Sequence, residues 1–480
     1  MSRAIHNALI YTVLNLAQKA LGFLVLPLYL WFLSPEEYGL VSYYMTLSVT
    51  IGVFFHMGLN ATIVRFFFDQ RASDEPGYHK KLYGTLLTVY VGISIIFSLI
   101  FFLGKSWIVF PFINIAEKTP YYEIALLFVV AFPYFEFYQR ILQARQEGQK
   151  FAKITFLYFI LQITLSIVLL VVFKLGALSL LIGRAGVELL FAGYSIYKII
   201  REYGFAFDRE IFRSTIRYSA PLIPNNFAGN FNNFANNYLV NQFINLASVG
   251  LLTVATQATN LLNSLNTGLT DAIRPWCYEK LSSNDVNQRD IYFRKMHSLM
   301  SAFSLLIAVT IFFSEEAFYL ILKEQYWETW KLMPYLGCYA LFNQLTSIWL
   351  IPLMYYEKGS KYVPVSTYLF IIINLGMCVF LIPRIGLVAT AIAMMVSRII
   401  SSLVLLHYCR KLSGVKIKIF DFYGTPLILV LCSFLVHLSD MSLTLRLLIW
   451  AGLTVFLIIW HRNELKEFVG TFQPILKRFT

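Results

Sequence analysis

Asparagine is concentrated in one stretch of the sequence, Pro221 to Asn245, which reads PLIPNNFAGNFNNFANNYLVNQFIN. On a helix with 3.6 residues per turn, one stripe of these amides shares a face, and Phe, Ala and Tyr occupy most of the opposite half. In an otherwise apolar chain, amides that faced lipid would lack hydrogen-bond partners, so we expect this face to line an aqueous cavity in a membrane bundle. The stripe consists of Asn226, Asn230, Asn233, Asn237 and Asn241.

Three cations stand where they could hold an anionic ligand. Lys19 lies about 15 residues into the first apolar stretch, where a charge costs about 2.5 to 3.5 kcal/mol, and Asn15 and Gln18 share its face. Arg65 and Arg274 occupy matching positions at the ends of two expected helices. The fork of N–H donors on arginine suits a phosphate group. The same pattern would also arise without a ligand, if Lys19 reaches water and the two arginines only satisfy the excess of basic residues on the cytoplasmic side.

Two further charged positions lie inside expected membrane helices. Arg184 and Glu188 are four residues apart, and we expect them to form an ion pair on one helix face. Glu188 is also a candidate for proton or sodium coupling. Arg398 occupies the repeat position of Glu188, has no evident partner, and is therefore a candidate for the cavity.

The sequence contains no motif of a catalytic, nucleotide-binding or metal site. The five cysteines include no CxxC pair, the seven histidines include no HxxxH spacing, and no GxxxxGK loop is present. We therefore expect no metal, no cofactor and no enzymatic activity.

The composition is that of an integral membrane protein. Of the 480 residues, 58% are hydrophobic and 14% are charged, whereas a soluble domain has about 25% charged residues. Apolar stretches of about 20 residues, each long enough to cross a hydrocarbon core, recur along the whole chain. About fourteen are expected, at 4–33, 37–64, 80–104, 121–144, 151–174, 176–202, 214–244, 248–276, 291–314, 329–356, 361–382, 386–411, 420–439 and 442–461.

An internal repeat with a period of about 210 residues divides these helices. Gly176 and Gly204 bracket one span, Gly386 and Gly414 bracket another, and residues 37–40 match 248–251. A repeat with an even number of spans keeps its orientation in the membrane. We predict an all-α membrane fold in which two six-helix lobes form a parallel repeat, with lobes at 1–205 and 206–415 and two more helices with a cytoplasmic tail at 416–480. A monomer is expected, because the fused lobes already supply an interface.

The net charge of +13 is distributed unevenly between the two sides of the expected membrane. About 29 of the 39 lysines and arginines lie on the side of the N-terminus and about 7 on the other side. Since cytoplasmic loops carry the excess of basic residues, both termini are expected in the cytoplasm. Contact with anionic membrane lipid explains the charge, and nucleic-acid binding is not needed.

The chain resembles the polysaccharide repeat-unit flippases, the O-antigen and capsule branch of the multidrug, oligosaccharidyl-lipid and polysaccharide exporter superfamily. The resembling segments are FLSPEEYGLVSYY, YSAPLIPNNFAGNFNNFANNYLVNQFINLASVGLLTVA and DAIRPWCYEKLSSND. The plan of two six-helix lobes and two terminal helices covers nearly the whole chain. Many relatives carry an acidic-basic pair where this sequence has Asn237 and Tyr238, so a role of that pair does not transfer.

The resemblance implies translocation of undecaprenyl-diphosphate-linked oligosaccharide across a bacterial inner membrane by alternating access, driven by an ion gradient. Amides suit sugar hydroxyls because each both donates and accepts hydrogen bonds. A polysaccharide polymerase and a chain-length regulator are the protein partners that such a role implies. The expected sugar-binding residues are Asn15, Gln18, Asn226, Asn230, Asn233 and Asn237, and the expected diphosphate-binding residues are Lys19, Arg65, Arg274 and Arg398.

Two other transport functions are compatible with the same fold. A multidrug-type antiporter for organic cations should present carboxylates in its cavity, whereas the polar faces of the first and seventh spans carry Lys19 and amides. A flippase for the peptidoglycan lipid precursor would be favoured by a larger cluster of cavity arginines. A membrane polymerase or ligase would need a longer outer loop than this chain offers.

Overall fold

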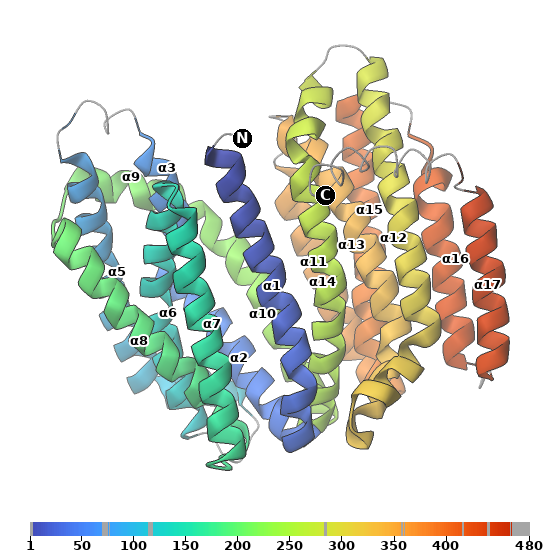
Figure 1. Cartoon of the computed structure of the whole chain (residues 1–480), viewed down its shortest axis with the longest axis horizontal. Helices are drawn as coiled ribbons and strands as arrows, with labels where there is room; N and C mark the ends of the chain where they lie inside the picture. Colours follow the sequence, from blue (N-terminus) through green and yellow to red (C-terminus); the bar gives the residue numbers. More distant parts are fainter. Residues whose placement is uncertain are drawn as a thin grey trace. The chain divides into compact units, whose positions relative to one another are not determined.

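The computed structural model describes residues 3–69, 75, 77–113, 119–282, 286–356, 359, 361–414, 417–438, 442–460 and 462. The chain divides into two compact units, Met1–Gly250 and Leu251–Thr480, called here the first unit and the second unit (Figure 1). Throughout the described ranges the regular elements are helical, as predicted.

The first unit is built from long helices joined by short connections. It contains α1 (Arg3–Phe32), α2 (Pro35–His56), α3 (Asn60–Phe67), α5 (Tyr78–Leu103), α6 (Tyr121–Ala144), α7 (Gly148–Val171), α8 (Ala177–Tyr203), α9 (Arg209–Ser219), α10 (Ile223–Phe243) and the start of α11 (Leu246–Ser282). Shorter turns of π-helix at Lys105–Val109 and of 3-10 helix at Phe110–Phe112 and Ala220–Leu222 complete it.

The second unit continues the same pattern. It contains the rest of α11, then α12 (Val286–Ile321), a 3-10 segment at Glu324–Leu332, α13 (Met333–Tyr355), α14 (Tyr362–Ile385), α15 (Val388–Ser413), α16 (Ile419–Leu438) and α17 (Leu443–Trp460).

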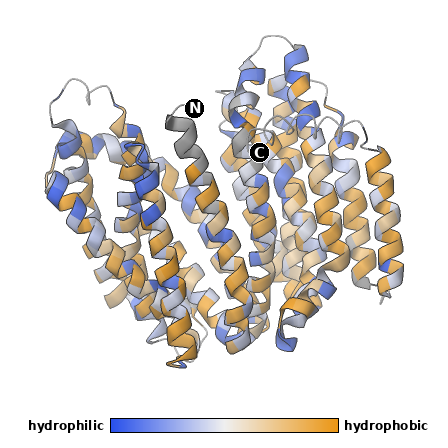
Figure 2. Ribbon diagram, viewed as in Figure 1, coloured by the Kyte–Doolittle hydropathy of each residue, from blue (hydrophilic) through white to orange (hydrophobic). Residues whose placement is uncertain are grey.

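Within the described residues, eleven helices are long and apolar enough to cross a membrane. Part of α1, Leu16–Phe32, adds a shorter apolar stretch. The long helices α10 and α11 carry many amides and hydroxyls, which lowers their hydropathy. Together these elements account for the fourteen spans that the sequence predicts. In each unit hydrophobic residues follow most of the length of the helices, and hydrophilic residues are frequent at their ends (Figure 2).

Two of the expected spans are each broken into two helices. The span expected at 37–64 ends as α2 at His56 because Met57 (φ 42°) and Gly58 (φ 68°) adopt left-handed conformations, and α3 then begins at Asn60. The span expected at 214–244 divides into α9 and α10 around Pro221 and Pro224. Proline suits the first turn of a helix and is costly in its interior, so a helix start at these prolines is favoured.

The repeat is visible in the local structure of each unit. In the first unit α8 packs against α6 and α7, and in the second unit α15 packs against α13 and α14. The four glycines that bracket α8 and α15 all have positive φ, between 54° and 70°. Glycine reaches this region without the steric cost that a Cβ imposes, which explains why the repeat keeps it at these positions. They are Gly176, Gly204, Gly386 and Gly414.

Close helix packing and a polar anchor hold the units together internally. Gly183 of α8 lies so close to Ser166 of α7 that a Cβ there would be 2.9 Å from the Ser166 Cα atom. In the second unit Arg446 of α17 contacts the carboxylates of Glu315 and Glu316 of α12, each at 2.7 Å. Large apolar side chains remain exposed along the helices, as expected where lipid is the solvent.

Candidate functional site

The amide face of α10 packs partly against α2 within the first unit. The side-chain amide of Asn237 donates hydrogen bonds to the hydroxyls of Ser42, at 3.2 Å, and Thr46, at 3.1 Å. The hydroxyl of Thr50 donates to the backbone carbonyl of Asn230 at 3.1 Å. Ser42, Thr46 and Thr50 are spaced four apart and form a hydroxyl face on α2. Sequence reasoning overlooked this face, although its spacing is a usable signal.

The other residues of the asparagine stripe remain more accessible. Asn226 and Asn233 are exposed and Asn230 is half-buried, whereas Asn237 is only 6% exposed. One part of the stripe therefore holds two helices together, and another part is free to contact water or a ligand. A buried amide bonded to hydroxyls contributes packing specificity, and an exposed amide keeps its donors and acceptors.

The cation predicted on α1 is accessible. Lys19 is exposed and makes no hydrogen bond or ion pair with any residue that the structure describes, and Gln18 is half-buried. The side chain of Asn15 lies outside the described residues. That α1 and α10 share one cavity stays a prediction.

Arg65 belongs to a basic region at one end of the first unit. Its guanidinium lies 4.1 Å from the centre of the Tyr218 ring of α9. Helix α9 begins with Asp208 as its N-cap, whose carboxylate accepts the N–H groups of residues 210 and 211. Ile211, Thr215 and Ser219 are buried on one face of this helix, and an opposite, exposed row carries Arg209, Arg213 and Arg217.

Glu188 has a different partner from the one expected. It is 1% exposed, and one oxygen of its carboxyl group accepts a hydrogen bond of 2.6 Å from the Tyr158 hydroxyl of α7. The other oxygen has no hydrogen-bond partner among the described residues. Arg184 lies over the Phe128 ring, 4.7 Å from its centre, and forms no ion pair with Glu188. The partners of Arg184 and Glu188 are therefore aromatic residues of α6 and α7, which the sequence of α8 alone does not reveal.

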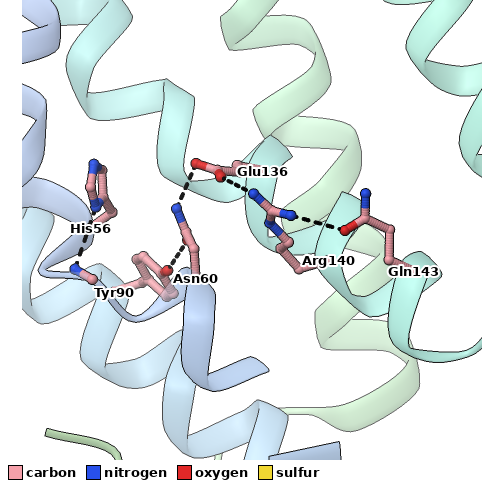
Figure 3. Close-up of polar contacts among 7 residues, drawn as sticks. His56, Asn60, Tyr90, Glu136, Arg140 and Gln143 are labelled. Atoms are coloured by element: carbon pink, nitrogen blue, oxygen red, sulfur yellow. Dashed lines mark hydrogen bonds and ion pairs between the residues drawn. The ribbon is translucent and has the colours of Figure 1, made fainter. Parts of the chain in front are cut away.

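A second glutamate of the first unit, Glu136, lies in a hydrogen-bonded cluster that sequence reasoning missed. Glu136 of α6 accepts hydrogen bonds from Asn60, at 2.6 Å, and from Arg140, at 3.1 Å (Figure 3). Tyr90 donates to the carbonyl oxygen of the Asn60 side chain at 2.5 Å, and Arg140 also contacts Gln143. The signal in the sequence is a glutamate and an arginine four apart inside an apolar span.

His56, at the end of α2 beside this cluster in Figure 3, has a local role. Its Nδ1 atom accepts the backbone N–H of Gly58 at 3.4 Å, in the turn that ends α2. His56 therefore stabilises the turn between α2 and α3.

Arg274 lies in a polar seam between α11 and α13 of the second unit. It lines a small cavity of about 90 Å³ together with Thr267, Thr270, Tyr278 and Ser347 and with the apolar Leu350, Ile351 and Met354. One turn further along, the amide of Asn343 donates to the side-chain oxygen of Asn263 at 3.1 Å. The sequence singled out only Arg274 here, since the hydroxyls and amides of this seam come from two helices about 80 residues apart.

Arg398 is held by aromatic side chains. Its guanidinium lies 3.9 Å from the centre of the Phe370 ring and 5.5 Å from that of Tyr339, and it donates to the Tyr339 hydroxyl at 3.5 Å. Cation–π contacts of this kind stabilise a partly desolvated arginine by about 2 kcal/mol. The sequence offered no partner for Arg398, and the structure supplies one from each of α13 and α14.

The predicted anion-binding residues thus occupy distinct surroundings. Lys19 and Arg65 belong to the first unit, and Arg274 and Arg398 to the second. Lys19 and Arg65 are exposed, Arg274 lines a small cavity, and Arg398 is enclosed by rings. Across the described residues no group of three histidine, cysteine or acidic side chains is arranged to hold a metal ion.

Comparison with solved structures shows which fold this is. The lipid II flippase MurJ in its inward closed conformation matches with a TM-score of 0.70 and 16% identity, over 95% of this chain and 99% of that one. An inward-facing multidrug resistance transporter of the MATE family, in the MOP superfamily, matches with a TM-score of 0.65 and 13% identity, over 84% and 94%. A MATE protein in complex with MaD3S matches with a TM-score of 0.54 and 12% identity, over 86% and 96%. These similarities establish the fold of this chain as that of the MurJ and MATE proteins.

Sequence comparison identifies the family. No protein of curated function matches the chain. The model of the family described as "polysaccharide biosynthesis protein" matches residues 4–279, more than half of the sequence. The chain therefore belongs to the polysaccharide biosynthesis protein family.

Proposed function

We propose that this protein is a flippase that moves undecaprenyl-diphosphate-linked oligosaccharide repeat units across the bacterial inner membrane by alternating access. The observation that carries the proposal is the accessible part of the α10 asparagine stripe in a protein of this family and fold. In this account the protein is a transporter, with both termini in the cytoplasm, and acts as a monomer. Its partners in the membrane are lipids, a polysaccharide polymerase and a chain-length regulator.

The sugar part of the substrate is recognised by amides. Each amide offers two N–H donors and one carbonyl acceptor, which matches the mixed hydrogen bonding of sugar hydroxyls. Asn226, Asn230 and Asn233 have accessible surface, and Gln18 on α1 is half-buried. Asn15 on α1 is proposed as a further member of this set. Asn237 takes part indirectly, because its bonds to Ser42 and Thr46 fix the rotation of α10 against α2.

The diphosphate is recognised by cations. Lys19 is the strongest candidate, since it is exposed and has no protein partner among the described residues. Arg65 follows, oriented by the ring of Tyr218 and near the arginine row of α9. Arg274 adds a guanidinium in a cavity that contains hydroxyl groups. Arg398 has the lowest rank, because its guanidinium is already covered by two rings.

An ion gradient drives the transport, with Glu188 as the group that takes up the ion. Burying an ionised carboxylate without a paired cation costs free energy, so binding of a proton or a metal cation beside it is favoured. Glu188 has one bonded and one unbonded oxygen, and the neutral acid could keep the bond from Tyr158 while carrying a proton. Protons are therefore the ion that this geometry favours.

The test is transfer of a fluorescent undecaprenyl-diphosphate oligosaccharide between the leaflets of liposomes that contain the purified protein. We expect wild-type protein to make the label accessible from the opposite leaflet. Lys19→Ala and the double variant Asn230→Leu, Asn233→Leu should each slow transfer by at least about ten-fold, since each removes charge-assisted or paired hydrogen bonds to the substrate.

Matched controls separate recognition from folding. Lys19→Arg keeps the charge and should retain most of the activity. Gln242→Leu removes an exposed amide of α10 that lies off the asparagine stripe, and should leave transfer unchanged. Efflux of a cationic dye without transfer of any lipid-linked sugar would move the protein to the multidrug antiporters, and transfer of only the peptidoglycan lipid precursor would make it a flippase of that class.

A further inference from the structure

An open cleft of about 520 Å³ lies in the second unit, beside the C-terminal turns of α15 and the first turn of α16. It takes no part in the function proposed above. Its lining divides into an apolar wall and a basic rim. The apolar wall is Leu403, Leu406 and Ile419, and the basic rim is His407, Arg410 and Lys411.

The order of these residues along α15 follows the polarity of a membrane. Positions 403, 406, 407, 410 and 411 are spaced three and four apart, so they share one face of the helix. Leu403 and Leu406 lie two turns inside the span, and Arg410 and Lys411 lie in its last turn. The cleft therefore changes from apolar to basic in the direction that runs from the hydrocarbon core to the water interface.

The rim keeps its positive charge within the part of the chain that the structure describes. Among the described residues, neither Arg410 nor Lys411 forms an ion pair. Arg410 donates to the backbone carbonyl of Ile417, which holds its guanidinium beside the cleft. The usual task of basic residues at a helix end is to bond the last carbonyls. Here Arg289 of α12 donates to one of these carbonyls, that of Ser413, at 3.1 Å, so the rim side chains are not needed to bond it.

The chemistry of the lining selects the kind of ligand. The six described residues that line it carry no amide, hydroxyl or carboxylate, the groups that usually bind a sugar. Leu403 and Ile419 are 39% and 46% exposed, and only a ligand with an apolar part would cover them. Basic pockets between membrane helices are typical sites for the headgroups of anionic lipids.

We propose that this cleft binds an anionic phospholipid such as phosphatidylglycerol. The lipid phosphate lies against the basic rim, and an acyl chain follows the apolar wall toward the hydrocarbon core. The lipid is a bound component of the protein and is distinct from the transported substrate, so the proposal stands whether or not the transport function holds.

The test measures binding of phosphatidylglycerol to the full-length protein in detergent, by native mass spectrometry and by the lipid-dependent rise of the thermal unfolding midpoint. Phosphatidylethanolamine, inorganic phosphate and an undecaprenyl diphosphate are the comparison ligands. The variants are His407→Gln with Lys411→Gln for the rim, Leu403→Ser for the wall, and Lys418→Gln as a control. Lys418 is exposed and close in sequence but does not line the cleft, so its loss changes the net charge without changing the site.

We expect phosphatidylglycerol to bind wild-type protein and to raise its midpoint more than either phosphatidylethanolamine or phosphate does. The rim variant should bind it about five-fold more weakly or worse, because each basic residue near the surface contributes about a five-fold factor toward anionic lipid. The wall variant should also weaken binding, and Lys418→Gln should not.

Four results would overturn the proposal. They are equal effects of the rim variant and Lys418→Gln, equal stabilisation by phosphate alone, equal binding of phosphatidylethanolamine, and a preference for undecaprenyl diphosphate over phosphatidylglycerol. Because the rim side chains His407 and Lys411 are exposed, their variants should fold normally, and the midpoint without added lipid checks this.

Discussion

Charged side chains inside the helical units are compensated in different ways. Glu136 is neutralised by Arg140 and receives a further bond from Asn60. Arg398 is covered by two aromatic rings. Within the described part of the chain, Glu188 accepts one hydrogen bond, from the hydroxyl of Tyr158, forms no ion pair, and is almost fully buried. A group left this poorly compensated gains most from binding an ion, which is why we assign the coupling role to Glu188.

The first prediction concerns this pair of residues. In liposomes under an imposed pH gradient, we expect wild-type transfer of the lipid-linked sugar to accelerate and Glu188→Gln to lose the acceleration while keeping its slow, gradient-independent rate. Tyr158→Phe should keep the response in part, since the carboxyl group remains. The measurement is the ratio of transfer rates with and without the gradient.

Glu136→Gln serves as the comparison for that experiment. Its carboxylate is already paired with Arg140, so its removal should alter stability more than the response to the gradient. If Glu188→Gln responds to the gradient as strongly as wild-type protein, Glu188 is not the coupling group. A response to a sodium gradient alone would identify a different ion.

Helix α2 connects several features at the scale of elements. Its start is stabilised by a capping box, in which Ser34 and Glu37 bond each other's backbone N–H groups. Its hydroxyl face holds α10. Its first turn also touches the start of α11 through glycines, because a Cβ at Gly39 would meet the carbonyl oxygen of Leu246 and one at Gly250 that of Pro35. These two glycines are the pair that the internal repeat matches.

The second prediction tests this close approach. Gly39→Ala and Gly250→Ala should each lower stability by about 1–3 kcal/mol, since the obstacle is backbone that cannot rotate away. Gly92→Ala, inside α5 with no atom near its added Cβ, should leave stability unchanged or raise it by up to about 1 kcal/mol. Thermal unfolding midpoints in detergent measure the difference. Equal behaviour of all three variants would contradict the contact.

At the scale of the whole molecule, the chain consists of two compact units, and α16 and α17 belong to the second. Helix α16 packs on α12 and α13, and α17 packs on α12. The ion pairs of Arg446 with Glu315 and Glu316 hold α17 in place, and the arginine side chain is only 9% exposed. The division into lobes at 1–205 and 206–415 remains a prediction about the repeat.

The third prediction follows from this anchor. Arg446→Met should destabilise the second unit by about 2 kcal/mol, because it leaves two carboxylates side by side without their cation and these are partly exposed. Hydrogen exchange should increase in α17 more than elsewhere. Arg384→Met is the matched control, since among the described residues that arginine bonds a carbonyl of its own helix and no carboxylate. Unchanged exchange in α17 would show that apolar packing alone holds it.

Much of the fold could be predicted from the sequence by itself. The length and apolarity of each span depend on neighbouring residues, so 121–144 was predicted with the bounds that α6 has, and most other spans agree within a few residues. The polar character of α10 and the helix ends at the glycines around α8 and α15 also depend on local sequence, and could be predicted for the same reason. The two expected spans that break do so where a left-handed turn or a proline interrupts an apolar run without changing its hydropathy. Helices α11 and α12 extend beyond the expected spans 248–276 and 291–314.

The partners of the polar side chains were decided only by the tertiary structure. Asn233 and Asn237 look alike in the sequence, yet one is exposed and the other bonds hydroxyls of α2 almost 200 residues away. Glu188 bonds Tyr158 and forms no ion pair with Arg184, and Glu136 bonds Asn60, for the same reason. Helical periodicity determines which residues share a face, but the rotation of each helix and the neighbour opposite that face depend on packing between distant parts of the chain.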